Sequence, residues 1–252
     1  MQIIKNLFGG GADKKKAGFC SAIIVAAGSG TRMGYSKNKL FLTIADRPVL
    51  AYTLQSFEEC KMIDEVILVT RQEDIMLCKE IIDISGSGKV SKIIAGGRER
   101  QHSVYNGLKE ISNNAALVAV HDGARPFVLP EHIEAAVKSA WEHGAAALGV
   151  RVKDTIKVVD EDLNIVKTPD RSRLWSVQTP QVFRVDILKA AHEEAAREGI
   201  EATDDCALVE RMGYTVKMVE GSYKNIKITT PEDILFAEAI VEGREWEEED
   251  EE

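Results

Sequence analysis

The chain has 252 residues, of which 44% are hydrophobic and 29% are charged, as is typical of globular proteins. This length suits one large α/β domain or two small ones, and either arrangement can bury a core. The formal net charge of −9 argues against a nucleic-acid partner, because binding to a phosphate backbone normally needs a basic face.

The two ends of the chain are expected to lie outside the folded domain. Residues 1–18 have an apolar core too short for a signal peptide, and no apolar run reaches the length of a membrane span. Residues 244–252 are rich in acidic side chains, which favours a disordered tail. We therefore expect a flexible N-terminal extension, one domain over residues 19–243, and a cytoplasmic protein with no membrane partner.

The cysteines and histidines form no disulfide or metal-binding pattern. Cys20, Cys60, Cys78 and Cys206 lie far apart, without CxxC spacing, and mostly within apolar segments. Buried, reduced thiols are the expected state. The five histidines form no HExxH motif, which disfavours a zinc enzyme.

The first predicted strand, residues 22–27 (AIIVAA), ends in a glycine-rich turn that is followed by positive charge. The run is short, β-branched and uncharged, as in a strand covered on both faces of a parallel sheet. The turn at residues 28–30 (Gly-Ser-Gly) leaves backbone N–H groups free to face an anion, and Arg32, Lys37 and Lys39 follow it. This combination predicts a polyphosphate site.

The loop matches neither of two familiar phosphate-binding motifs. A Walker loop needs Gly-Lys-Ser/Thr, but Gly34 is followed by Tyr35. A dinucleotide fingerprint needs G-x-G-x-x-G opening a helix, but the third glycine here comes one residue too late, in a polar and basic segment. The alternative is a plain strand-to-helix turn with solvated cations, and three cations near the turn favour phosphate over it.

Downstream, apolar patterns of strand and helix type alternate. The predicted elements are helix 48–60, strand 65–70, helix 73–85, strand 90–97, helix 99–111, strand 116–123, helix 130–144 and strand 145–152. This alternation predicts an α/β fold with a doubly wound, mostly parallel sheet. Ligands of such sheets bind beyond the carboxyl ends of the strands, so residues at strand ends are candidates for function.

Two further strand ends carry candidate site residues. Gly96 and Gly97 lead into a polar helix start, which taken alone indicates only a turn. Asp122 follows an apolar strand and precedes Arg125. Burying this carboxylate is costly unless a cation, hydrogen bonds or a metal satisfies it. An Asp122–Arg125 pair is one explanation, and a metal ion or a substrate hydroxyl is the favoured one.

After residue 152 the alternation stops. Two β-type runs, at 155–159 and 164–168, are joined by a turn over 160–162, which predicts a hairpin arm spanning about residues 153–177. Its apolar residues are poorly placed to join the main core. Burial against a second copy of the chain is therefore expected.

The last part of the chain returns to alternating elements. The expected elements are helix 185–199, a helix capped by Thr203 or Asp204, strands 214–221 and 224–229, and helix 231–243. Lys227 lies within the last of these strands, between two isoleucines. An isolated cation there is either an edge residue or an active-site charge.

Together, several blocks of sequence resemble one enzyme family. The blocks are AAGSGTRMG with Lys39, GGRERQHSV, VHDGARPFV, VKDTIK, DRSRLWSVQTPQVF, TDDCALVE and NIKITTPEDI. In this order they resemble the 2-C-methyl-D-erythritol 4-phosphate cytidylyltransferases, from about Phe19 to Gly243. The resemblance implies a Rossmann-like sheet of the nucleotidyltransferase type with a projecting β-hairpin arm.

The resemblance also implies a reaction and its catalytic residues. The phosphate of methylerythritol phosphate would attack the α-phosphorus of CTP in line and expel pyrophosphate. Arg32 and Lys39 would grip the triphosphate, and Lys227 would join Lys39 around the α-phosphorus. Mg²⁺, or another divalent cation, would bridge phosphate oxygens. Asp122 would hold that ion or bind substrate hydroxyls.

By the same resemblance, the two substrates would contact different groups of residues. The nucleotide-binding residues would be Ala26, Ala27, Gly28, Gly30, Gly97 and Ser103. The substrate-binding residues would be Asp122, Arg125, Thr155, Arg171 and Thr203. The arm would form a homodimer, so that Thr155 and Arg171 serve the site of the neighbouring subunit.

Two alternative functions remain open on the sequence. A cytidylyltransferase for ribitol 5-phosphate shares the loop, the HDxARP-like block and the TPQ segment, although the AAGSG form of the loop favours methylerythritol phosphate. A non-catalytic nucleotide-binding protein is more distant. The joint presence of Arg32, Lys39, Asp122 and Lys227 argues against it.

Overall fold

The computed structural model describes residues 18–28 and 38–249, and within them the chain folds around one central sheet. The order of its strands is β11-β7-β10-β6-β1-β4-β5. The strands are β1 (Phe19–Val25), β4 (Glu65–Thr70), β5 (Val90–Ala95), β6 (Ala115–Asp122), β7 (Ala145–Arg151), β10 (Trp175–Arg184) and β11 (Lys217–Glu220). The predicted doubly wound, mostly parallel sheet is confirmed.

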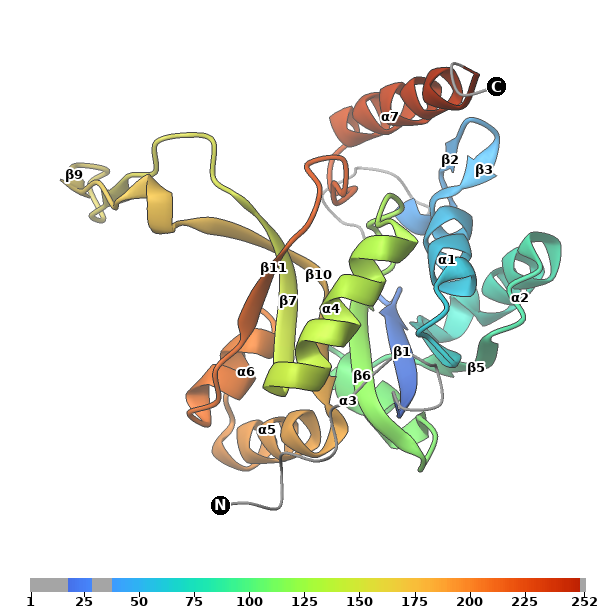
Figure 1. The fold of residues 1–252 in the computed structure, drawn as a ribbon, viewed down its shortest axis with the longest axis horizontal. Helices are drawn as coiled ribbons and strands as arrows, with labels where there is room; N and C mark the ends of the chain where they lie inside the picture. Colours follow the sequence, from blue (N-terminus) through green and yellow to red (C-terminus); the bar gives the residue numbers. More distant parts are fainter. Residues whose placement is uncertain (1–17, 29–37, 250–252) are drawn as a thin grey trace, which may run out of the picture.

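Helices cover both faces of the sheet (Figure 1). The α-helices are α1 (Val49–Glu59), α2 (Ile75–Ser85), α3 (Arg100–Glu110), α4 (Pro130–His143), α5 (Val185–Glu198), α6 (Asp205–Arg211) and α7 (Glu232–Glu249). Short elements are β2 (Thr43–Ile44), β3 (Arg47–Pro48), β8 (Val158–Val159) and β9 (Ile165–Lys167), and the 3-10 turns η2 (Lys39–Phe41), η3 (Gln72–Asp74) and η4 (Arg171–Arg173).

The alternation of side chains in β1 separates two hydrophobic cores. Ala22 and Ile24 point into the core beneath α1 and α4, whereas Ile23 points into the core beneath α3 and α5. All three are fully buried, as a strand covered on both faces requires. The uncharged run in the sequence therefore reflects burial on both sides.

The chain reverses direction along the sheet at β1, and this defines a crevice. From β1 the chain builds β4 and β5 on one side, and then crosses back to add β6 on the other side. All these pairings are parallel. The carboxyl ends of β1 and β6 therefore flank a topological switch point, where ligands of open α/β sheets bind.

The strand β10 was missed by the sequence analysis. It runs antiparallel between β6 and β7, and its first residues, from Trp175, already pair with β7. Its sequence does not show a continuous apolar run, so the pattern alone predicts an arm that extends to about residue 177. The strand is the antiparallel member of a mixed sheet.

Two expectations for the C-terminal part were wrong. Residues 224–229 do not form a strand, since Ile228 N–H donates only an isolated hydrogen bond, of 2.8 Å, to Ala124 in the loop after β6. The helix α7 does not end at Gly243 but continues to Glu249, so the tail is helical that far. Glutamate and arginine have high helix propensity, and no proline interrupts this stretch.

The predicted hairpin arm is confirmed as a projection from the sheet (Figure 1). β8 and β9 pair antiparallel at its tip. Its apolar side chains stay exposed in the single chain: Ile156, Val158, Val159, Leu163, Ile165 and Val166. The arm therefore contributes nothing to either core.

Candidate active site

A pocket of about 410 Å³ opens at the switch point, beyond the ends of β1 and β6. It brings together eight of the residues predicted from the sequence. These are Ala26, Ala27, Gly28, Lys39, Gly97, Ser103, Asp122 and Lys227. They come from five separate segments of the chain.

One wall of the pocket is formed by close backbone packing. Gly97 N–H donates to Ser103 Oγ over 3.1 Å, and this hydroxyl donates to the Glu99 carbonyl. A Cβ on Gly96 would lie only 2.5 Å from Ala27 Cβ, and one on Gly97 would lie 2.4 Å from His102 Cβ. The glycine pair is thus required for this wall, which the sequence alone had indicated only as a turn.

The side chain of Asn38 anchors the chain directly before Lys39. The buried side chain of Asn38 donates to the Ala26 carbonyl at 3.4 Å and to Asp74 Oδ2 at 3.0 Å. Arg71 holds Asp74 from the other side with two hydrogen bonds, of 2.7 and 3.0 Å. Lys39 begins η2 directly after this anchor and lines the pocket.

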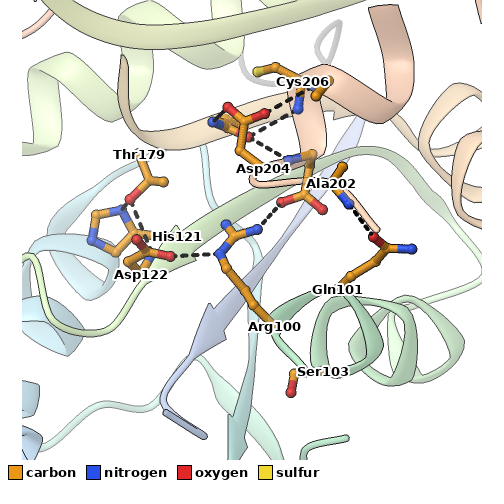
Figure 2. Close-up of polar contacts among 12 residues, drawn as sticks. Arg100, Gln101, Ser103, His121, Asp122, Thr179, Ala202, Asp204 and Cys206 are labelled. Carbon is orange, nitrogen blue, oxygen red and sulfur yellow. Dashed lines mark hydrogen bonds and ion pairs between the residues drawn. The ribbon is translucent and has the colours of Figure 1, made fainter. Parts of the chain in front are cut away.

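Asp122 is the acidic centre of the pocket, and both of its oxygens are paired. Figure 2 shows the contact with Arg100. Arg100 Nε lies 3.0 Å from Oδ1, and Lys227 Nζ lies 2.6 Å from Oδ2. Burial opposes ionisation of Asp122, but the charges of Arg100 and Lys227 outweigh it and hold the pKa of this carboxyl well below its ordinary value. The carboxylate is therefore ionised, and it fixes two cations.

Neither side-chain partner of Asp122 is Arg125, the residue that one of the two explanations from the sequence had named. The sequence analysis considered an Asp122–Arg125 pair, but Arg125 instead donates to the Asn225 carbonyl at 2.8 Å. Arg100 was missed as a site residue. Its signal was its position three residues after Gly97, at the start of a helix that follows a strand end.

The strand end that carries Asp122 is held by a neutral histidine. Thr179 Oγ1 accepts from Asp122 N–H at 3.1 Å and lies 3.1 Å from His121 Nδ1, and His121 Nε2 lies 3.2 Å from the Arg125 carbonyl. Burial lowers the pKa of His121 to about 4. A neutral ring that accepts from Thr179 and donates to the carbonyl satisfies all these groups, so the contacts position Asp122 without adding charge.

Several predicted residues do not line this pocket. Thr203 is exposed just before α6, where Asp204, not Thr203, caps the helix by accepting from Ala207 N–H. Thr155 and Arg171 lie on the arm, and Arg171 donates to the Lys153 carbonyl. Gly30 and Arg32 lie outside the described residues.

The described residues of the pocket provide few ligands for a metal ion. Among them, no group of three or more His, Cys, Asp or Glu side chains could hold a metal. Asp122 is engaged by two cations. A divalent cation would therefore fit this pocket only beside a ligand that brings oxygen atoms of its own, such as a polyphosphate.

The four cysteines are free and buried, as predicted. In the part of the chain that the structure describes, no helix is long and apolar enough to cross a membrane.

The doubly wound sheet, with a cationic pocket and a glycine-lined wall at its switch point, is typical of α/β proteins that bind phosphorylated ligands. A family model described as "IspD: 2-C-methyl-D-erythritol 4-phosphate cytidylyltransferase" matches residues 20–243. The chain belongs to this family.

Individual relatives agree with the family assignment. A 2-C-methyl-D-erythritol 4-phosphate cytidylyltransferase of Caldanaerobacter subterraneus is 53% identical over 222 residues, which cover 88% of this chain and 98% of the relative. The protein of the same name from Clostridium botulinum (strain Langeland) is 49% identical over 222 residues, covering 88% and 97%. These names disfavour the ribitol phosphate alternative.

Solved structures agree as well. The 4-diphosphocytidyl-2C-methyl-D-erythritol synthase of Anaerococcus prevotii superposes with a TM-score of 0.81 at 36% identity, covering 91% of this chain and 98% of that one. The 2-C-methyl-D-erythritol 4-phosphate cytidylyltransferase of Thermus thermophilus gives a TM-score of 0.71 at 33% identity, covering 88% and 98%.

Proposed function

We propose that the chain transfers CMP from CTP to 2-C-methyl-D-erythritol 4-phosphate, giving 4-diphosphocytidyl-2-C-methyl-D-erythritol and pyrophosphate. The observation that carries this proposal is the pocket in which Lys39, Lys227 and Asp122 meet the glycine-lined wall. Both substrates are anionic, and the pocket has the fixed cations that such a reaction needs.

The nucleotide is assigned to the wall formed by the end of β1 and the start of α3. Ala26, Ala27, Gly28, Gly97 and Ser103 present small side chains and backbone edges there. Such a surface admits a flat pyrimidine ring and disfavours a larger purine. Gly30 belongs to the same assignment through the family resemblance.

The transfer step is assigned to the cations around the α-phosphorus. The substrate phosphate oxygen attacks in line, and pyrophosphate leaves on the opposite side. Lys39 and Lys227, with Arg32 by family resemblance, stabilise the charge that develops on the phosphoryl oxygens. No general base is needed, because the attacking phosphate oxygen is already ionised near neutral pH.

The second substrate is assigned to the rim beyond Asp122. Asp122, Arg125 and Thr203 would bind it from one chain, and Thr155 and Arg171 would reach it from the arm of a second copy. The exposed apolar side chains of the arm support this homodimer, since an isolated hairpin of this kind is marginally stable in water.

The cofactor is assigned as Mg²⁺, although another divalent cation could serve. Asp122, at the edge of the triphosphate site, is the protein carboxylate that could contact it. When bound, the ion neutralises part of the triphosphate charge. The buried free cysteines support a reducing compartment such as the cytoplasm.

A product assay tests the function directly. Purified protein with CTP, Mg²⁺ and methylerythritol phosphate is expected to release pyrophosphate and to form a CDP-alcohol of the matching mass. Ribitol 5-phosphate serves as the competing substrate in a parallel reaction. Turnover of ribitol 5-phosphate alone would contradict the assignment, and no turnover with either alcohol phosphate would favour a non-catalytic nucleotide binder.

A further inference from the structure

Arg100 joins two carboxylates that come from distant parts of the chain. Its Nε donates to Asp122 Oδ1 at 3.0 Å, and its NH1 donates to Asp205 Oδ2 at 2.7 Å. Asp122 ends β6, Asp205 opens α6, and Arg100 itself opens α3. One guanidinium thus ties three elements together beside the pocket, and Figure 2 shows it pointing at Asp122.

The far side of this link is rigidly held. Asp205 has only 1% of its side chain exposed, and its other oxygen lies 3.0 Å from His192 Nε2 on α5. Gln181 Oε1 accepts from Asp205 N–H at 3.2 Å and thereby ties α6 to the central strand β10. Asp205 is therefore an anchor that cannot move without disturbing the core.

The near side of the link ends at the reaction centre. Asp122 Oδ2, the oxygen that Arg100 does not hold, lies 2.6 Å from Lys227 Nζ. The Lys227 side chain is 38% exposed, and its segment is not part of a strand. Its ammonium group thus depends on Asp122 for its position, and Asp122 depends on Arg100.

We propose that Arg100 is a positioning residue for the transfer step: it fixes Asp122 against Asp205 and, through Asp122, holds Lys227 at the α-phosphorus site. This inference rests on the proposed function. The guanidinium donates to the two carboxylates from two separate nitrogens, Nε and NH1, whereas the three N–H donors of a lysine share one nitrogen and cannot reproduce this spacing. Arginine is therefore required at this position.

If Arg100 had only a structural role, its loss would have a different effect on activity. A double variant can distinguish the structural role from the positioning role. Removing Arg100 leaves Asp205 as a buried charge with less compensation, so Arg100→Gln alone is expected to lower the melting temperature. Adding Asp205→Asn removes that uncompensated charge. If Arg100 served only to neutralise Asp205, the double variant would recover both its stability and its activity.

The experiment compares the wild type, R100K, R100Q and R100Q/D205N in melting temperature, CTP affinity and pyrophosphate release. Arg184→Gln is the matched control, because Arg184 makes a comparable two-bond contact with Asp186 on the surface, far from the pocket. We expect R100Q/D205N to regain the part of the melting temperature that Asp205 accounts for, while kcat stays about 10- to 100-fold below wild type and CTP affinity changes less than about threefold.

R100K keeps the charge, and it is expected to fold and to show the same selective loss of kcat. It therefore tests the inference even if the glutamine variants fail to fold. Recovery of kcat in the double variant, wild-type kcat in R100K, or a loss of CTP affinity that matches the loss of kcat would each overturn the positioning role. A wild-type protein without turnover would instead contradict the proposed function.

Discussion

The pocket and the arm differ in how their side chains are held. In the pocket, the central carboxylate has a fixed place: Asp122 is held by Arg100 and Lys227, and its strand end is held by His121 and Thr179. In the arm, the apolar side chains remain exposed and β8 pairs only with β9 at the tip.

The difference shows that the geometry of the pocket is set within one chain, whereas the arm has an apolar surface that a second chain could cover. The sheet fixes the pocket, because strand ends cannot move without breaking two cores. Among the residues that the structure describes, neither hydrophobic core holds the apolar side chains of the arm in this way. The residues of the arm are therefore expected to act in a partner's site, and substitutions in the two regions should have different effects.

The largest effect is expected in the pocket. Lys227→Ala should lower kcat/KM for transfer by about 10²- to 10³-fold, because it removes a charge placed where the phosphoryl charge develops. The measurement is steady-state pyrophosphate release with CTP and methylerythritol phosphate.

The matched control is Lys138→Ala on α4, a surface lysine that is paired with Glu134 at 3.4 Å. This variant should keep the wild-type rate. If the rate of Lys227→Ala stayed within about twofold of wild type, a catalytic role of Lys227 would be contradicted. The loss of one hydrogen-bond donor to the transition state lowers the rate far more than twofold.

The buried His121, which holds the strand end of Asp122, should affect how the stability of the protein depends on pH. Burial lowers the pKa of His121 from 6.5 to about 4, so between these values the unfolded chain binds a proton that the folded chain does not. Stability should fall as the pH falls through this window, by at most about 3.5 kcal/mol, since one pKa unit corresponds to about 1.4 kcal/mol.

Urea titrations of the wild type and of His121→Asn at pH 7, 6, 5 and 4 measure this slope, which should be smaller in the variant. His143→Asn, on an exposed residue at the end of α4, is the control. Asp122 and Asp205 have depressed pKa values and lose stabilisation only near and below their ordinary pKa of 3.8. An unchanged slope in His121→Asn would contradict the neutral, buried histidine.

The smallest effect on the stability of a single chain is expected at the arm. Ile165 is 62% exposed, so Ile165→Glu should change the free energy of unfolding of the protomer by less than about 0.5 kcal/mol. The same charge should nevertheless dissociate a dimer that buries this residue, as sedimentation velocity would show.

Ile84→Glu provides the comparison, because Ile84 is an 86% exposed isoleucine on α2. It should leave the association state unchanged. Equal sedimentation of the wild type and Ile165→Glu would exclude the arm as the dimer contact.

Most of the sheet could be predicted from the sequence, because strands buried on both faces are continuous apolar runs. The residues 65–70 are an example, observed as β4 with the same bounds. The strand β10 could not be predicted, since tertiary pairing decides its neighbours and its first residues follow directly from the arm. The segment of Lys227 looked like a strand because isoleucines flank the lysine, but its backbone meets a loop.

In the site, the strand-end rule identified Asp122, but not its partner. A buried carboxylate at a strand end predicts that some cation compensates its charge. Which cation does so depends on how α3 and α6 pack around the strand end. Arg125, three residues away in sequence, was the nearest candidate, whereas Arg100, twenty-two residues away, is the observed one. Local sequence shows the need, and only the fold shows which residue satisfies it.

The most direct test of the account mixes two inactive variants. Lys227→Ala has a defective pocket and an intact arm, whereas Arg171→Ala has an intact pocket and a defective arm. If each site combines the pocket of one chain with the arm of the other, random re-pairing of equal amounts should restore about a quarter of the wild-type activity, because half of the dimers are mixed and each has one intact site. If the mixture stays as inactive as its components, although re-pairing is verified, the division of the site between two chains is wrong.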